Sequence, residues 1–191
     1  GPPWEMQRMW VNEVKPRLSQ RVSGEVIVSR IIKTAGIPEA KLDELVSPLL
    51  SSTNPTLALY AKIDGIHLRL TAKSHERARA DEMISQAESK LKSILGQAIW
   101  GFDDDILEVL IGNMLRERKL TLATMESCTG GLLASTITDV PGSSDYFKGG
   151  LVTYSAQSKA AFGVDTSLLS KKGTVDPDVA AAMAKSARLR L

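Results

Sequence analysis

A serine, a lysine and a glycine-rich turn in the second half of the chain have the types and spacing that acyl-transfer chemistry needs. A buried-type strand over 120–125 leads into Glu126-Ser127-Cys128-Thr129-Gly130-Gly131, and a helix is expected over 132–138. This arrangement aims free backbone N–H groups into a cleft at the carboxyl end of the strand, where they suit a phosphate or a developing oxyanion. Ser127 lies where a nucleophile would lie, although the G-x-S-x-G, Walker A and G-x-G-x-x-G patterns are all missing.

A nucleophilic serine needs a base, and histidine is a poor candidate because His67 and His75 lie about fifty residues or more upstream. A second strand, ending at Tyr154, leads into a helix that contains Lys159. If the two strands are parallel neighbours, Ser127 and Lys159 meet at one edge of the sheet, where α/β sheets bind ligands. A lysine must be neutral to act as a base, and Tyr154 is a candidate member of the network that would favour this state.

Plainer interpretations stay open on residue type alone. Ser127 or Thr129 can serve only as a helix cap, and Lys159 can be an ordinary solvated lysine. Cys128 is an alternative nucleophile because a helix N-terminus favours thiolate. Successive strand residues point to opposite faces, so we expect only one of Ser127 and Cys128 to face the cleft, and we favour the serine.

The composition is that of an ordinary globular chain. Of 191 residues, 43% are hydrophobic and 24% charged, with a net charge of +2, which argues against disorder and against broad attraction to nucleic acid or anionic membranes. The single cysteine excludes an internal disulfide and argues against a Cys-based zinc site. No apolar run approaches the ~20 residues that span a bilayer, and no export signal is present. We therefore predict a soluble, cytoplasmic protein.

The elements ahead of the Ser127 segment predict a separate β-α-β-β-α-β unit of the ferredoxin-like or KH-like kind, so that the chain as a whole is α/β. The hairpin is expected around Asp64-Gly65, and the second helix is expected to bury Ile84, Ala87, Leu91 and Ile94. Strands are predicted over 25–34, 57–63, 66–72 and 98–100, and helices over 38–50 and 74–95.

Both ends of the chain lack ordinary boundaries. A helix with apolar residues from Met6 to Val14 is expected to end before Pro16, and it has no initiator Met ahead of it. An apolar helical face over 106–115 opens the second unit, and a last helix runs from Asp178 to Leu191 without a glycine stop. We expect a fragment of a longer protein.

Three motifs closely resemble the CinA family, competence/damage-inducible proteins whose C-terminal domain is a nicotinamide mononucleotide (NMN) deamidase. They are the turn at 126–131, Thr138-Asp139-Val140-Pro141-Gly142-Ser143-Ser144, and the segment from Val152 to Lys159. Residues 54–56 and 67–73 resemble the family's KH-like middle domain. The resemblance implies three parts: 1–22 as the tail of a missing molybdopterin-binding-like domain, 23–101 as the KH-like domain, and 102–191 as a truncated deamidase domain.

The resemblance implies that the carboxamide of NMN is hydrolysed to nicotinate mononucleotide and ammonia, without metal or other cofactor. Ser127 would be the nucleophile, Lys159 its base, and Tyr154 would orient or tune the pair. Backbone N–H groups of Thr129, Gly130 and Gly131 would hold the oxyanion or the substrate. Because the family's later strands are absent here, we expect this chain to be weakly active or inactive by itself.

A non-catalytic alternative is a nucleic-acid-binding or oligomerisation module formed by the KH-like unit. Acidic residues interleave with its basic ones and no G-x-x-G clamp is visible, so we expect a solvated face and no nucleic acid. We also expect a homo-oligomer and no membrane association. The basic residues concerned are Lys62, Arg69, Lys73, Arg77 and Arg79.

Overall fold

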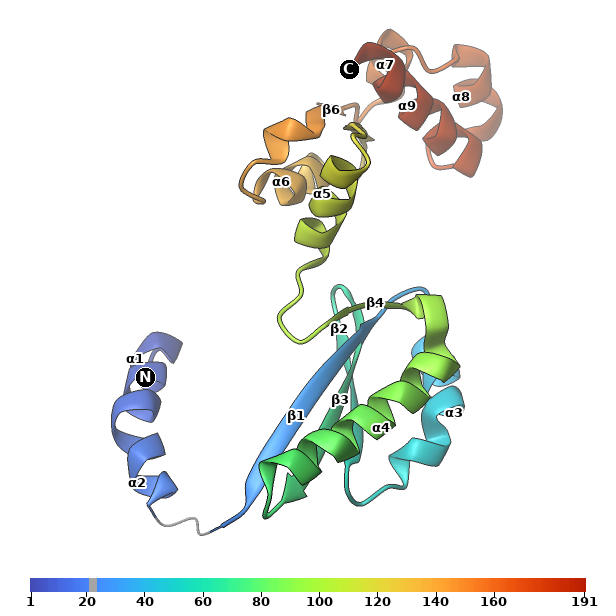
Figure 1. Ribbon diagram of the computed structural model, residues 1–191. Coiled ribbons are helices and arrows are strands. Elements are labelled where there is room, and N and C mark those ends of the chain that lie inside the picture. Colours follow the sequence, from blue (N-terminus) through green and yellow to red (C-terminus); the bar gives the residue numbers. More distant parts are fainter. Residues whose placement is uncertain (21–23) are drawn as a thin grey trace. The chain divides into compact units, whose positions relative to one another are not determined.

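The computed structural model describes residues 1–20 and 24–191, and the chain divides into two compact units, Gly1–Asp104 and Asp105–Leu191 (Figure 1). The domain boundary predicted between residues 22 and 23 lies outside the described residues. None of the described helices is both long enough and apolar enough to cross a lipid bilayer.

The first twenty residues are helical almost throughout. Helix α1 (Pro3–Met9) passes into a π-helical turn, Trp10–Val14, and then into α2 (Lys15–Ser19). The prediction that the helix ends before Pro16 is wrong. A proline ring in a regular α-helix clashes with the carbonyl four residues earlier, and the wider π-helical turn directly ahead of α2 relieves that crowding.

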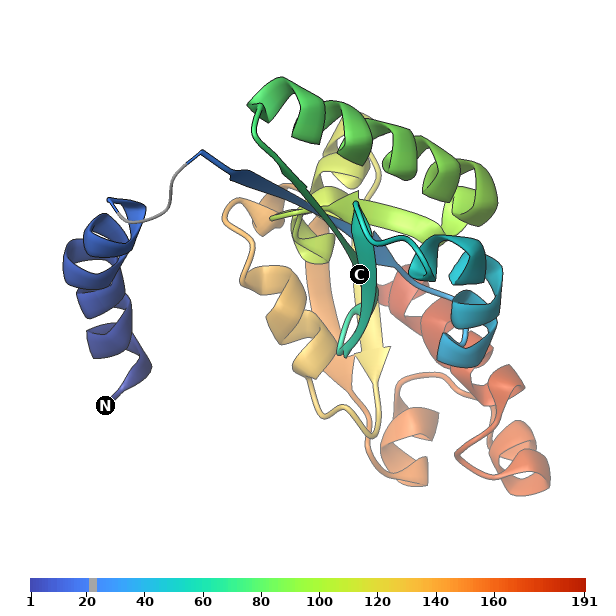
Figure 2. The same cartoon turned by 90° about the horizontal axis from the view of Figure 1, so that it is seen from below.

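The rest of the first unit is one antiparallel sheet covered by two helices. The strands are β1 (Val26–Thr34), β2 (Thr56–Lys62), β3 (Gly65–Ser74) and β4 (Ile99–Phe102), in the order β2-β3-β1-β4. Helices α3 (Glu39–Leu50) and α4 (Arg77–Leu95) pack together on one face, as Figures 1 and 2 show from two directions. The predicted β-α-β-β-α-β order is confirmed.

The hairpin between β2 and β3 turns at Ile63 and Asp64, one residue earlier than its Asp-Gly signal indicates, because Gly65 already pairs with Lys62. Gly65 has a φ of +129°, and a Cβ built there would lie 2.0 Å from the main-chain oxygen of Thr34. The glycine therefore serves the close approach of this hairpin to the end of β1 as much as it serves the turn.

The core of this unit lies between the sheet and the two helices, and α3 contributes the fully buried Leu42 and Val46. Helix α4 buries Ala80, Ile84, Ala87, Leu91 and Leu95, all spaced three or four residues apart. Ile94, predicted to be buried, is 39% exposed: three- and four-residue spacing from Leu91 allows either Ile94 or Leu95 on the buried face, and the helix buries Leu95. The strands contribute Ile32, Leu57, Ile66, Leu68, Leu70 and Ala72 to the same core.

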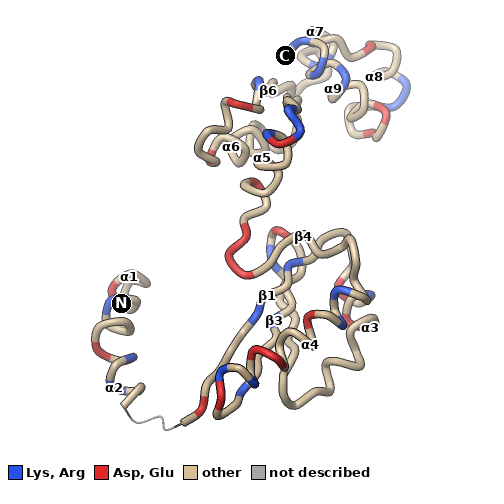
Figure 3. Tube along the Cα trace, viewed as in Figure 1, with Lys and Arg blue, Asp and Glu red and all other residues tan. Residues whose placement is uncertain are grey.

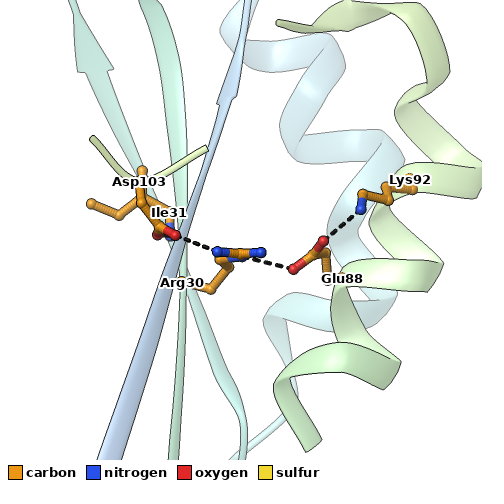
Figure 4. Close-up of polar contacts among 5 residues, drawn as sticks. All are labelled: Arg30, Ile31, Glu88, Lys92 and Asp103. Atoms are coloured by element: carbon orange, nitrogen blue, oxygen red, sulfur yellow. Dashed lines mark hydrogen bonds and ion pairs between the residues drawn. The ribbon is translucent and has the colours of Figure 1, made fainter. Parts of the chain in front are cut away.

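A network of charged residues joins the sheet to α4 and to the end of β4 (Figure 4). The Arg30 guanidinium on β1 donates to Glu88 Oε2 at 2.8 Å and also to Asp103. Lys92 Nζ lies 2.6 Å from the other oxygen of Glu88, and the Ile31 N–H donates to Asp103 Oδ1 at 2.9 Å. The network therefore ties three elements of the first unit together.

The second unit is built on two parallel strands, β5 (Leu122–Glu126) and β6 (Phe147–Val152), with Glu126 beside Val152. Its helices are α5 (Leu107–Glu117), α6 (Leu132–Thr138), α7 (Ala156–Ala161), α8 (Thr166–Lys172) and α9 (Pro177–Arg190). A small core gathers Val164, Leu169, Val179 and Met183. The apolar face predicted over 106–115 is only partly covered, since Ile111 and Met114 are exposed.

Candidate active site

The carboxyl ends of the two parallel strands bring Ser127 and Lys159 together. Ser127 directly follows β5, while Lys159 lies in the first helix after β6. Lys159 Nζ donates to Ser127 Oγ at 2.8 Å. The predictions that the strands are parallel neighbours and that these side chains meet at one sheet edge are confirmed. Their catalytic roles stay predictions.

Lys159 is fully buried, which is rare for a lysine. Besides Ser127 Oγ, its Nζ donates to the carbonyl oxygens of Thr153 at 2.7 Å and of Tyr154 at 3.1 Å. All three contacts are to uncharged oxygens. The interpretation of Lys159 as a solvated surface residue is therefore wrong.

The three contacts of Nζ fit the side chain in either protonation state, because an ammonium can donate to all three oxygens. A neutral amine carries two N–H groups and one lone pair, which suit two carbonyl acceptors and one hydroxyl donor. In that state the carbonyls of Thr153 and Tyr154 accept from Lys159, and the Ser127 hydroxyl donates to it. In that neutral state the geometry is the one a general base needs, because the serine hydroxyl would then donate its proton to the amine.

A capping box fixes the start of the helix that carries Lys159. Ser155 Oγ accepts from the Ser158 N–H, and Ser158 Oγ accepts from the Ser155 N–H, both at 3.0 Å. Such reciprocal bonds satisfy N–H groups that a helix start leaves without partners. They hold α7, and with it Lys159, in place after β6.

The turn after β5 differs from the open anion nest that the sequence predicts. The Glu126 carboxylate, 5% exposed, accepts from the N–H groups of Gly131 at 3.1 Å, Leu133 at 3.0 Å and Ala134 at 2.9 Å. The Gly130 N–H donates to the Ser127 carbonyl at 3.1 Å. The amides of Gly130 and Gly131 thus already have acceptors in the chain, so the predicted use of these two amides for substrate disagrees with the geometry.

The charge of Glu126 suits this position. Burial raises the pKa of its carboxyl, but hydrogen bonds from Ala134, the Thr129 side chain, Leu133 and Gly131 lower it more, and the pKa lies below its usual value. Of the three amides predicted to bind substrate, that of Thr129 alone has no acceptor in the part of the chain that the structure describes.

Tyr154 enters the site through its backbone. Its carbonyl accepts from Lys159 Nζ, whereas its side chain is 74% exposed. The main chain thus helps to orient the base, and a role for the phenol stays a prediction.

Ser127 and Cys128 both line an open cleft of about 500 Å³, together with Met125, Leu133, Val175 and Met183. The expectation that only one of them would face the cleft is wrong. Both residues come after the end of β5, in a turn, where strand alternation no longer applies. The contact with Lys159 singles out Ser127.

The sequence reasoning did not identify Glu126 or Thr153 as parts of this site. Glu126 could have been found from its position, because a carboxylate at the end of a buried-type strand with no cation near it in the sequence must find hydrogen-bond donors in the adjoining turn. Thr153 acts through its carbonyl, which no residue type reveals. Within the described residues, no group of three His, Cys, Asp or Glu side chains is arranged to hold a metal ion.

Three of the five basic residues of the nucleic-acid alternative are paired with acidic side chains, and a fourth, Arg69, donates to Ser29 Oγ at 3.4 Å. Lys73 pairs with Glu25, Arg77 with Asp81 and Arg79 with Glu82. Figure 3 shows the same alternation of charge along α4. This pairing agrees with a solvated face and gives no support to the nucleic-acid alternative.

Two family profiles match the chain. One, described as the damage-inducible protein CinA KH domain, matches residues 29–101, and the other, described as the CinA C-terminal domain, matches residues 104–191.

Curated relatives are similar over nearly the whole chain. A putative competence-damage inducible protein of Moorella thermoacetica is 48% identical over 190 residues, which cover 98% of this chain and 46% of that protein. One from Clostridium perfringens strain SM101 is 42% identical over 186 residues, 97% of this chain and 45% of that protein. The chain therefore spans about half the length of these relatives.

Solved structures are similar to part of the chain. The competence/damage inducible protein CihA of Agrobacterium tumefaciens is 37% identical, with a TM-score of 0.42, over 44% of this chain and 51% of that one. A CinA superfamily protein of Escherichia coli is 33% identical, with a TM-score of 0.43, over 44% and 49%.

Proposed function

This chain belongs to the CinA family of competence/damage-inducible proteins, and we propose that its second unit carries the nucleophile and base of an amide hydrolase that converts NMN to nicotinate mononucleotide and ammonia. The observation that carries the proposal is the 2.8 Å contact between a fully buried Lys159 and Ser127. The assignment of 23–101 and 102–191 as KH-like and deamidase domains is part of the same proposal.

In the first half of the reaction, the neutral amine of Lys159 takes the hydroxyl proton of Ser127 as Oγ attacks the carboxamide carbon. The tetrahedral intermediate carries a negative oxygen, for which the Thr129 N–H is the candidate donor. Collapse breaks the carbon–nitrogen bond. The Lys159 ammonium gives its proton to the leaving nitrogen. Ammonia departs, and the acyl group remains on Ser127 as an ester.

In the second half, Lys159 is neutral again and takes a proton from water, which attacks the ester carbon. Collapse of this intermediate breaks the ester bond, the Lys159 ammonium returns its proton to Ser127 Oγ, and the released carboxylic acid loses its remaining proton to solvent. Because one amine serves both halves, its hydrogen bonds to the Thr153 and Tyr154 carbonyls keep it aimed at Oγ throughout.

The cleft supports a flat aromatic amide as the substrate class. Its volume of about 500 Å³ lies in the usual range for small-molecule sites, and Met125, Leu133, Val175 and Met183 give it apolar walls beside Ser127. A pyridine ring fits such walls, and its carboxamide would then lie at the nucleophile.

The test is ammonia release from NMN by the unchanged chain and by Ser127→Ala and Lys159→Met. Both substitutions should reduce release by about 10³-fold or more, because each removes half of the proton-transfer pair. Lys185→Met, which alters an exposed lysine of α9, is the matched control and should keep full activity. Thermal melting checks that each variant stays folded.

Since the chain spans about half of its curated relatives, the same substitutions are also made at the aligned positions of the Moorella thermoacetica relative. Ammonia release there that does not change on loss of the serine would remove it as the nucleophile. If Lys185→Met lowers ammonia release as much as Lys159→Met does, Lys159 is not the base.

A further inference from the structure

We infer that Glu126 is a positioning residue for Ser127. Its carboxylate accepts hydrogen bonds from the amides at the start of α6, and its carbonyl binds Thr153, whose own carbonyl orients Lys159. The inference rests on the proposed function, since it concerns how the same Ser–Lys pair is held. It goes beyond the predicted use of this turn, which assigned the amides to a ligand.

The first support is the bonding of the side chain. Oε2 accepts from the N–H groups of Gly131 and Leu133, and Oε1 accepts from that of Ala134. The Thr129 side chain also hydrogen-bonds to this carboxylate. An ionised carboxylate has about four acceptor positions, so four donors use its whole capacity. Glu126 therefore has none left for a substrate or for acid–base work.

The second support is the bonding of the main chain. The Glu126 carbonyl accepts from the Thr153 N–H at 2.8 Å, and the Thr153 carbonyl accepts from Lys159 Nζ at 2.7 Å. One residue thus binds the turn after Ser127 through its side chain and the support of the base through its carbonyl. Ser127 directly follows Glu126 in the sequence and precedes the amides that the carboxylate binds.

The consequence is geometric. Four residues, 127–130, separate Glu126 from Gly131, and the carboxylate pins both ends of that loop. Without this anchor the loop can adopt other conformations, and Ser127 Oγ is no longer held at 2.8 Å from Lys159 Nζ. A displacement of about 1 Å at a nucleophile can reduce a rate by about 10²-fold.

The test compares Glu126→Gln and Glu126→Asp with the unchanged chain. Glutamine keeps the size but turns an NH₂ group toward an amide donor, while aspartate keeps the charge and is one methylene shorter. Asp165→Asn is the matched control, because Asp165 also accepts a helix N–H, that of Ser167 at 2.7 Å, in the same unit but outside the residues that line the cleft at Ser127.

Two readouts do not depend on NMN. Amide hydrogen exchange follows the N–H groups of Gly131, Leu133 and Ala134, and a fluorophosphonate probe gives the rate of covalent labelling at Ser127. We expect Glu126→Gln to speed exchange at these amides and to slow labelling by about 10²-fold, with Glu126→Asp in between and Asp165→Asn unchanged. With NMN, kcat should fall while KM changes little.

A folded Glu126→Gln chain that is labelled at the original rate would overturn the inference. If that variant fails to fold by thermal melting, the labelling rate of Glu126→Asp decides in the same way. Equal slowing in Asp165→Asn would also overturn it, since the effect would then be general. Slow labelling in Glu126→Gln, with no ammonia released from NMN by the full-length Moorella thermoacetica relative, would keep the inference and reject the proposed function.

Discussion

Replacing Glu88 by glutamine should weaken the first unit, because this carboxylate is the acceptor at the centre of the network in Figure 4. Its side chain is 12% exposed and takes bonds from Arg30 and Lys92. Glutamine fills the same space, so packing is preserved and the charge is removed. The experiment therefore isolates the electrostatic part of the network.

The magnitude follows from the two contacts. A hydrogen bond to a charged group contributes roughly 1 kcal/mol more than a neutral one, and that applies to the part-buried contact with Arg30. Lys92 is half exposed, so its contact adds about 0.5 kcal/mol or less. We expect the free energy of unfolding to fall by about 1.5 kcal/mol, which shifts the urea midpoint by about 0.5–1.5 M.

The effect should also depend on pH. Burial raises the pKa of Glu88, but the bonds from Lys92 and Arg30 lower it more, so the folded-state pKa lies below 4.5. A lowered carboxyl pKa stabilises the fold fully above the unfolded-state value and loses that effect as pH falls through the folded-state value. The difference between the original and Glu88→Gln chains should thus be constant above about pH 5 and shrink below about pH 4.

Urea unfolding is followed by fluorescence in a Trp4→Phe, Trp10→Phe background, which leaves Trp100 in β4 as the single reporter. Glu82→Gln, which alters an exposed pair with Arg79, is the matched control and should change stability by less than about 1 kcal/mol. A Glu88→Gln shift no larger than that of the control, or a difference that widens toward low pH, would refute the reasoning.

Two further substitutions test local geometry. Gly65→Ala should lower the free energy of unfolding by more than about 2 kcal/mol in the same urea assay, because its Cβ would meet the Thr34 oxygen. The control Gly36→Ala, with φ +78° and open space around a Cβ, should lower it by only about 1 kcal/mol. Ser155→Ala should remove about 1 kcal/mol of capping from α7, seen as faster amide exchange over 156–161 and lower ammonia release, while Asp165→Ala, which uncaps α8, should leave ammonia release unchanged.

Much of the architecture is predictable because periodicity and turn signals are local. The order of elements in the first unit and helix 132–138 follow from apolar spacing and from Asp64-Gly65 and Gly130-Gly131. The errors have equally local causes. Helical spacing from Leu91 allows either Ile94 or Leu95 on the buried face of α4, and Pro16 follows a π-helical turn that the residue types do not indicate.

The Ser–Lys contact was predictable for a different reason. Parallel strands place their carboxyl ends at one edge, so any pair of chemistry-bearing residues just beyond two such strands is a candidate pair. The burial of Lys159 was not predictable, because it depends on two carbonyls, of Thr153 and Tyr154, whose positions only the fold determines. Residue type alone favours the opposite outcome for lysine.

Glu126 shows the limit of pattern-based reasoning about anion sites. A strand, a glycine-rich turn and a helix start together predict amides that attract negative charge, and that attraction is present. The sequence does not say whether the charge comes from a ligand or from the chain. Here the Glu126 carboxylate, one residue before Ser127, binds the amides in place of a ligand. It is favoured over a free anion because it belongs to the same chain and is already buried next to them. The prediction that these amides attract negative charge was therefore correct, and in this turn the attraction fixes the position of Ser127. The anionic part of any substrate must then be bound by other groups.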